Sequence, residues 1–188
     1  MARRDPVRPD AVDAILEQWR RELPEVDVAP LAVFGRIHRV FLRYQAHITD
    51  VFNEYGINAA AFDIMAALRR HGAPYRLTAG ALADTSLITS GGVSLRLDRL
   101  EKVGLVTRER DEVDKRVVYV KLTDAGVELI EKVAAAHFAN EENLLVGLTP
   151  TERRQLGQLL SRLERSLDGY ETTLRGNGGT RAEPDDAF

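Results

Sequence analysis

Apolar residues recur at helical spacing along most of this chain. The spacing predicts helices over about 9–23, 31–55, 59–70, 78–83, 91–103 and 124–145, and a last helix that begins near residue 149. Residues typical of helix ends support these limits, because Asn58, Thr78 and Thr149 can cap helices and Gly56 and Gly104 can end them. The chain is therefore predicted to be mainly α-helical.

After Gly104 the hydrophobic period changes from helical to alternating. Residues 105–110 and 116–122 are predicted to form two strands, the second rich in β-branched and aromatic side chains. The charged residues 111–114 between them form the predicted hairpin tip. A helix, a short helix, a turn, a helix and a two-stranded hairpin, in this order, make a winged helix-turn-helix domain.

Composition excludes several classes of protein. The chain has 188 residues and no Cys, so disulfides, thiol redox chemistry and zinc–cysteine sites are excluded. No apolar run is long enough to span a bilayer, and no apolar stretch of a signal peptide follows the first residues. We expect a cytoplasmic protein without a membrane partner.

The net charge of the chain is −3. A nucleic-acid-binding surface on such a chain must therefore concentrate positive charge locally.

Sequence motifs give no support to an enzyme. There is no phosphate-binding glycine loop, no metalloprotease motif and no nucleophile elbow. The four histidines lie on different predicted helices without metal-ligand spacing: His38, His47, His71 and His137. We expect no enzymatic activity and no cofactor.

We expect the predicted helix over 91–103 to be the DNA-recognition helix. A helix presented at an angle by its partner helix fits the major groove of B-DNA, and its N-terminal end suits a phosphate. Basic residues at the hairpin tip can reach a neighbouring groove or the backbone. The predicted DNA-binding residues are Thr89, Ser90, Gly91, Gly92, Ser94, Leu95, Arg110, Lys115 and Arg116.

A dense set of residues follows this pattern. It comprises the run L-D-R-L-E-K-V-G-L-V over 97–106, then Arg108, Arg110, Asp111, Asp114-Lys115-Arg116 and L-T-D-A-G over 122–126. With these residues the segment 78–123 resembles the DNA-binding domain of the MarR family of bacterial regulators. The resemblance extends over nearly the whole chain.

This resemblance implies a homodimer. Residues 31–57 and 124–174 would supply the dimerisation helices, 58–123 the winged helix-turn-helix domain and 9–23 an added N-terminal helix. The Gly-rich, polar residues 175–188 are expected to be a disordered tail. The resemblance also implies an ion pair between Asp98 and Arg116 that braces the recognition helix against the wing, which is the predicted hairpin of residues 105–122.

Four residues resemble the sensor set of the urate-responsive branch of this family: Trp19, Asp63, Arg96 and Arg108. Two arginines can hold a flat anion through fork-like hydrogen bonds, and an indole can stack on it. The resemblance implies a small anionic effector such as urate or a related purine, although an aromatic acid or phenolic metabolite fits the same residues. Trp19 in simple core packing and Asp63 in a structural ion pair with Arg96 are the alternatives.

We expect a sequence-specific regulator that binds a pseudo-palindromic operator on double-stranded DNA and represses transcription until the effector releases it. The alternative is a winged-helix module that binds small molecules or proteins without binding DNA. The mild acidity of the chain and the outward Leu95 leave this alternative open.

Overall fold

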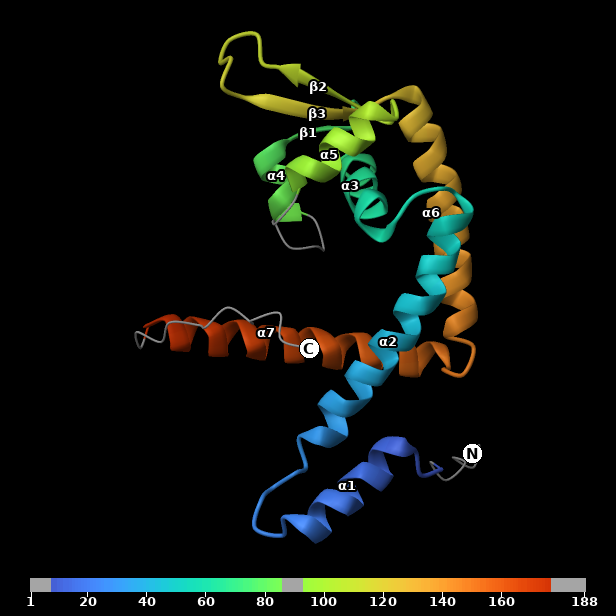
Figure 1. Cartoon of the computed structure of the whole chain (residues 1–188), viewed down its shortest axis with the longest axis vertical. Coiled ribbons are helices and arrows are strands. Elements are labelled where there is room, and N and C mark those ends of the chain that lie inside the picture. Colours follow the sequence, from blue (N-terminus) through green and yellow to red (C-terminus); the bar gives the residue numbers. More distant parts are fainter. Residues whose placement is uncertain (1–7, 86–92, 177–188) are drawn as a thin grey trace. The chain divides into compact units, whose positions relative to one another are not determined.

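The computed structural model of the protein describes residues 8–85 and 93–176. These ranges contain, in order, α1 (Ala11–Glu22), α2 (Leu31–Glu54), α3 (Ala59–Arg70), β1 (Arg76–Thr78), α4 (Ala79–Thr85), α5 (Val93–Lys102), β2 (Val106–Arg110), β3 (Val118–Leu122), α6 (Asp124–Leu144) and α7 (Pro150–Gly176) (Figure 1). The predicted fold class, mainly helical with a small wing, is confirmed. None of the helices in these ranges is long and apolar enough to cross a membrane.

Side-chain caps begin two helices where the sequence predicts them. Asn58 Oδ1 accepts a hydrogen bond from the Ala61 N–H at 2.9 Å. The Thr149 N–H donates to Glu152 Oε2 at 2.9 Å, and the Glu152 N–H donates to Thr149 Oγ1 at 3.3 Å. These bonds satisfy backbone donors that the first turn of a helix leaves unpaired.

The C-terminal boundary differs from the prediction. α7 continues to Gly176, so residues 175 and 176 are helical, whereas the expected tail starts at residue 175. The remainder of that tail, residues 177–188, lies outside the described residues.

The sheet contains a strand that the sequence does not predict. β1 pairs with β3 in antiparallel orientation, and the other edge of β3 pairs with β2. Three residues are too few to show an alternating pattern, which explains why β1 is missed. Thr78 ends β1 and also caps α4 as predicted, because its Oγ1 accepts the Ala81 N–H at 3.1 Å. The third strand therefore ties the wing to the start of the helix-turn-helix.

One hydrophobic core holds the winged helix together. Its buried side chains come from α3 to α6 and all three strands, and include Ile64, Met65, Leu68, Leu77, Leu82, Leu97, Leu100, Val106, Val120, Leu122 and Ile130. A second cluster of Ile48, Phe52 and Val133 joins α2 to α6. The removal of this apolar surface from water is the main stabilising contribution to the domain.

The added helix α1 is attached to α2 by apolar and charged contacts. Val12 and Leu16 are buried against α2, where Gly35 leaves room for Val12. Arg36 donates to Asp10 Oδ2 at 2.9 Å and to Asp13 Oδ1 at 2.7 Å. The Asp10 N–H and the Arg36 guanidinium hold the pKa of Asp13 below its usual value. These bonds pin the N-terminal end of α1.

The chain divides into two compact units, Met1–Asn140 and Glu141–Phe188. The second unit holds the end of α6 and α7. Within it, the Arg153 guanidinium donates to Glu142 Oε1 at 2.6 Å and to the carbonyl oxygens of Leu145 and Leu148, both at 3.0 Å. Arg153 thereby fixes the turn between the two helices.

The turn after α5 meets the start of α6 at close range. The Thr123 N–H donates to the Leu105 carbonyl oxygen at 3.1 Å, and Thr123 Oγ1 donates to that of Gly104 at 2.7 Å. A Cβ on Gly126 would lie 2.1 Å from the Leu105 oxygen. Only glycine allows this approach of two backbones.

We predict that Gly126→Ala lowers the free energy of unfolding by roughly 2–4 kcal/mol, because the new methyl group must push the two backbones apart. Urea unfolding followed by circular dichroism measures the loss. Gly80→Ala is the control, since its Cβ would meet no atom within 4 Å. Equal stability of the two variants would contradict the close approach.

Candidate functional site

α5 has one face in the core and one in solvent. Leu97 and Leu100 anchor the inner face, whereas Ser94 and Leu95 are exposed, Leu95 to 56%. The predicted contact residues Thr89, Ser90, Gly91 and Gly92 lie outside the described residues. A helix held by its apolar face with its other face free has the geometry that enters a major groove.

Two aspartates order the tip of the hairpin between β2 and β3. Asp111 Oδ1 accepts the N–H groups of Val113 and Asp114, both at 2.9 Å. Asp114 Oδ1 accepts the Arg116 Nε at 3.1 Å and the Arg116 N–H at 3.0 Å. These bonds favour the ionised carboxylates, so the pKa of Asp111 and the pKa of Asp114 are both lowered.

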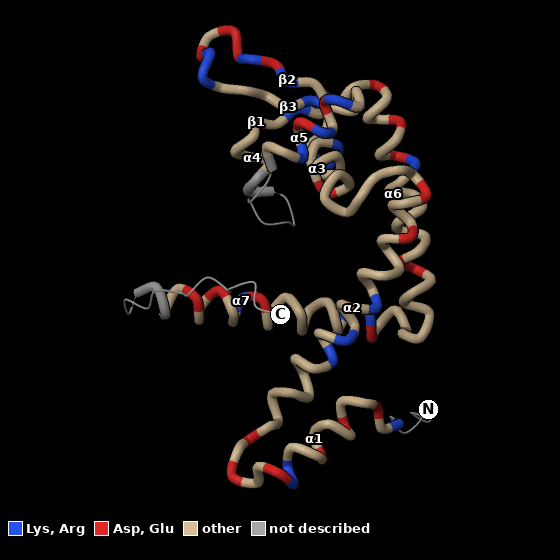
Figure 2. The backbone as a smooth tube through the Cα atoms, viewed as in Figure 1, with Lys and Arg blue, Asp and Glu red and all other residues tan. Residues whose placement is uncertain are grey.

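The ordered tip presents its basic side chains to solvent. Arg110, Lys115 and Arg116 are exposed, and the Arg116 side chain is 92% accessible. Figure 2 shows positive and negative residues following one another closely along the wing. The two aspartates thus order the turn, while the three basic side chains stay accessible to solvent.

We predict that Asp111→Ala speeds hydrogen exchange of the Val113 and Asp114 amides by roughly fivefold, because the loss of a hydrogen bond of this kind costs about 1 kcal/mol. NMR exchange rates measure the effect. Glu112→Ala removes the same charge from the same tip and is the control. If the two variants exchange alike, Asp111 does not order the turn.

Asp98 pairs with Arg108 and not with Arg116. Arg108 Nη2 lies 2.6 Å from Asp98 Oδ1, and Arg108 Nη1 lies 3.1 Å from Glu101 Oε2. The predicted Asp98–Arg116 ion pair is therefore wrong. Arg116 is held at the tip by Asp114, whereas Arg108 lies in the middle of β2, beside α5. A brace between α5 and the wing exists, but another arginine forms it.

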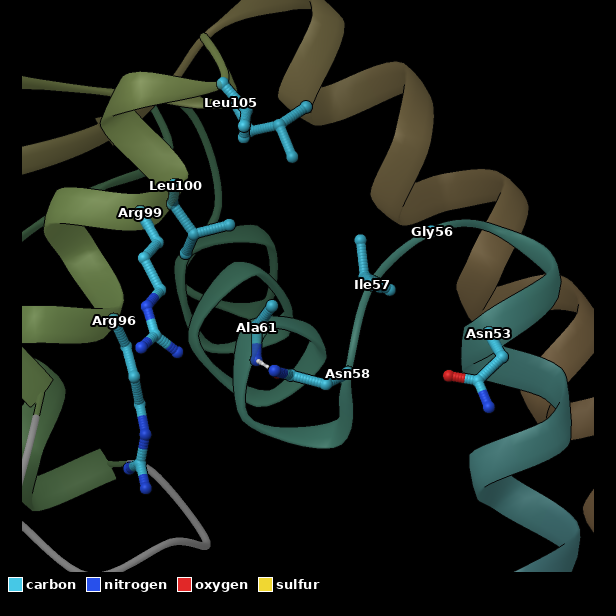
Figure 3. Close-up of a pocket in the computed structure, with 10 residues that line it drawn as sticks. Asn53, Gly56, Ile57, Asn58, Ala61, Arg96, Arg99, Leu100 and Leu105 are labelled. Carbon is cyan, nitrogen blue, oxygen red and sulfur yellow. Dashed lines mark hydrogen bonds between the residues drawn. The ribbon is translucent and has the colours of Figure 1, made fainter.

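A cavity of about 460 Å³ lies between α5, the start of α3 and the end of α2 (Figure 3). Its volume is in the range of pockets that hold small molecules. Arg96 and Arg99 project side by side from α5, and Asn53 and Asn58 add polar groups. The other lining residues are Gly56, Ile57, Ala61, Leu100, Val103 and Leu105.

The polar groups of the cavity favour an anion. Arg96 Nη1 is buried without a hydrogen-bond partner among the described residues. Asn58 uses its oxygen to cap α3, which leaves its amide NH₂ as a donor. Two guanidinium groups and an amide donor can bind a carboxylate or an enolate-like oxygen pair.

Comparison with known proteins identifies the family. Residues 55–117 match a family model described as the MarR family. PecS of Dickeya dadantii, an HTH-type transcriptional regulator, is 39% identical over 156 residues, which are 83% of this chain and 94% of that protein. The chain belongs to the MarR family. It is a DNA-binding transcriptional regulator with a winged helix, and its relatives are regulators and not enzymes.

Solved structures agree with this assignment. A MarR variant from E. coli in complex with operator DNA superposes with a TM-score of 0.63 at 25% identity, over 77% of this chain and 96% of that chain. BpsR from Bordetella bronchiseptica, whose DNA binding is regulated by 6-hydroxynicotinic acid, has a TM-score of 0.64 at 25% identity, over 70% of this chain and 92% of that chain.

The four sensor residues predicted for this MarR-family protein are not gathered in one place. Arg96 lines the cavity, but Asp63, Trp19 and Arg108 are not among its lining residues. Asp63 is buried on α3, and one of its oxygens has no hydrogen-bond partner within the described ranges. The structure has no ion pair between these two described residues, Asp63 and Arg96. Trp19 is half-exposed on α1.

Besides Arg96, the cavity has three polar lining residues, and the sequence predicts none of them as part of a site: Asn53, Asn58 and Arg99. Arg99 follows Arg96 by three positions, which places both on one helix face, and this spacing could have revealed it. Asn58 is recognised only as a cap. Nothing in the local pattern indicates that the α2–α3 turn faces a cavity.

Proposed function

We propose that this MarR-family regulator is a homodimeric repressor that leaves a pseudo-palindromic operator when a small anion binds beside Arg96. The observation that carries the proposal is the position of α5. Its exposed residues Ser94 and Leu95 suit DNA, and its Arg96 and Arg99 line the cavity. A ligand that moves this one helix would change the fit to DNA.

The proposed DNA interface combines α5 and the wing. Recognition helices of the two copies would enter successive major grooves about 34–36 Å apart. Arg110, Lys115 and Arg116 would contact the flanking backbone or minor groove, and Thr89–Gly92 would contact phosphate. The likeness to MarR in complex with operator DNA supports this arrangement.

Exposed apolar side chains support the proposed homodimer. On α2 they are Val33, Phe34, Val40, Phe41 and Leu42, each about half-exposed or more. On α7 they are Leu156, Leu159, Leu160, Leu167 and Tyr170. Large exposed apolar patches mark interaction sites, and a second copy of the same chain would bury them.

The proposed effector is a flat anion, either urate or a related purine, or an aromatic acid. The paired arginines support it, and so does the likeness to BpsR, which is regulated by an aromatic acid. We keep Asp63 and Trp19 in this proposal. Asp63 has a buried acceptor to offer, and the half-exposed Trp19 can cover a ligand once a second copy is present.

We predict that Arg116→Ala weakens operator binding and reduces the slope of log K against log salt by about one, as expected for one lost phosphate contact. Fluorescence anisotropy with the duplex that the wild-type protein selects from a randomised pool gives both quantities. Lys132→Ala, a surface cation on α6, is the control. Equal salt slopes for the wild type and Arg116→Ala would show that Arg116 contacts no phosphate.

We predict that Arg96→Ala keeps operator affinity within about threefold but loses the tenfold release that about 1.4 kcal/mol of coupling gives the wild type. Gel shifts with urate and with 6-hydroxynicotinate measure the release. Leu95→Ala, next to it on the exposed face, should instead lower affinity and keep the release. A normal response of Arg96→Ala would remove Arg96 from the effector site.

A further inference from the structure

Val113 lies at the tip of the hairpin between β2 and β3 with its side chain in solvent. It is 95% exposed, and no other large apolar side chain of the described residues is exposed to that extent. The apolar side chains assigned to the proposed dimer lie on α2 and α7, so Val113 is not one of them. The proposed homodimer therefore does not account for a valine at this position.

Hydrogen bonds hold the backbone on both sides of this side chain. The Val113 N–H donates to Asp111 Oδ1 at 2.9 Å, and the Asp114 N–H donates to the same oxygen at 2.9 Å. The Asp111 N–H donates to the Val117 carbonyl oxygen at 3.0 Å and closes the hairpin. Because a β-branched side chain also has few rotamers, Val113 projects from an ordered backbone and loses little conformational entropy when it is buried.

Basic residues flank Val113 on both sides in the sequence. Arg110 precedes it, Lys115 and Arg116 follow it, and all three side chains are exposed. Their proposed contacts are with the DNA backbone, so Val113 would lie between them and face the groove. The minor groove is about 6 Å wide, which admits a side chain as small as valine but not a helix.

An apolar side chain can distinguish base pairs in the minor groove through the one donor that this groove contains. Acceptors on the groove floor are common to all base pairs, whereas the N2 amino group is present only on guanine. Valine cannot accept a hydrogen bond, so a guanine beneath it would lose water from its amino group without gaining a partner. An A·T pair at the same place avoids this cost.

We infer that Val113 is a specificity-determining residue of the DNA interface, which enters the minor groove beside each half-site and selects base pairs that lack the guanine amino group. This inference rests on the proposed binding of DNA by α5 and the wing. An apolar contact displaces no counterions, so its loss leaves the salt dependence unchanged, unlike the loss of a phosphate contact by Arg116.

The test uses the full-length protein and the duplex that the wild type selects from a randomised pool. Outside the two major-groove half-sites, each A·T pair is replaced in turn by G·C and by inosine·C, since inosine is guanine without its amino group. At the pair beneath Val113, the wild type is expected to bind the G·C duplex about tenfold more weakly than the original. It is expected to bind the inosine·C duplex as tightly as the original.

Val113→Thr keeps the size and branching of the side chain and adds a hydroxyl group that can accept a hydrogen bond from guanine. It is expected to bind all three duplexes within about threefold of one another, with the salt slope of the wild type. Val146→Thr is the matched control, because it makes the same substitution at a valine that is 84% exposed between α6 and α7. This control is expected to keep the tenfold discrimination.

Tenfold discrimination by Val113→Thr would overturn the inference, because another residue would then read the amino group. Equal binding of the three duplexes by the wild type would also overturn it. So would equally weak binding of the G·C and inosine·C duplexes, which would place the readout in the major groove, where these two pairs are alike. A wild-type protein that selects no duplex would contradict the proposed function itself, and the inference with it.

Discussion

The carbonyl oxygen of Leu105 lies so close to Gly126 that no side chain fits between them. Thr123 donates two hydrogen bonds, to the carbonyl oxygens of Gly104 and Leu105, that hold the same two segments together. Leu105 follows α5 and precedes β2, so this contact connects the recognition helix, the first strand of the wing and the start of α6. The three elements therefore meet backbone to backbone at this contact, without an intervening side chain at Gly126.

In the same domain, several acidic side chains are paired with arginines. Arg108 binds Asp98 and Glu101, and Asp114 holds Arg116 while leaving most of that side chain in solvent. A chain with a net charge of −3 can present a basic surface to DNA when its acids are occupied locally. Arg96 and Arg99 line a cavity on the same helix, so the arginines around α5 divide into separate sets with separate neighbours.

The parts of the fold that the sequence predicts are those that depend on residues close together in the chain. The helical and alternating periods place most helices and both wing strands within a few residues of their observed limits. Caps need only their own first turn, which is why Asn58, Thr78 and Thr149 are predicted correctly. β1 is missed because a three-residue strand is defined by its partner β3 and not by its own pattern.

The amino-acid pattern is enough to predict the order of elements, the helix caps and the basic residues of the wing. Tertiary structure alone decided which acid each arginine meets. Arg108 and Arg116 have the same charge and lie on the same hairpin, but the packing of β2 against α5 brings only Arg108 to Asp98. The cavity likewise depends on packing, since Asn53 lies on α2, Asn58 is the cap of α3 and Arg99 lies on α5. Periodicity and capping act within a turn of chain, whereas ion pairs and cavities depend on how distant segments pack.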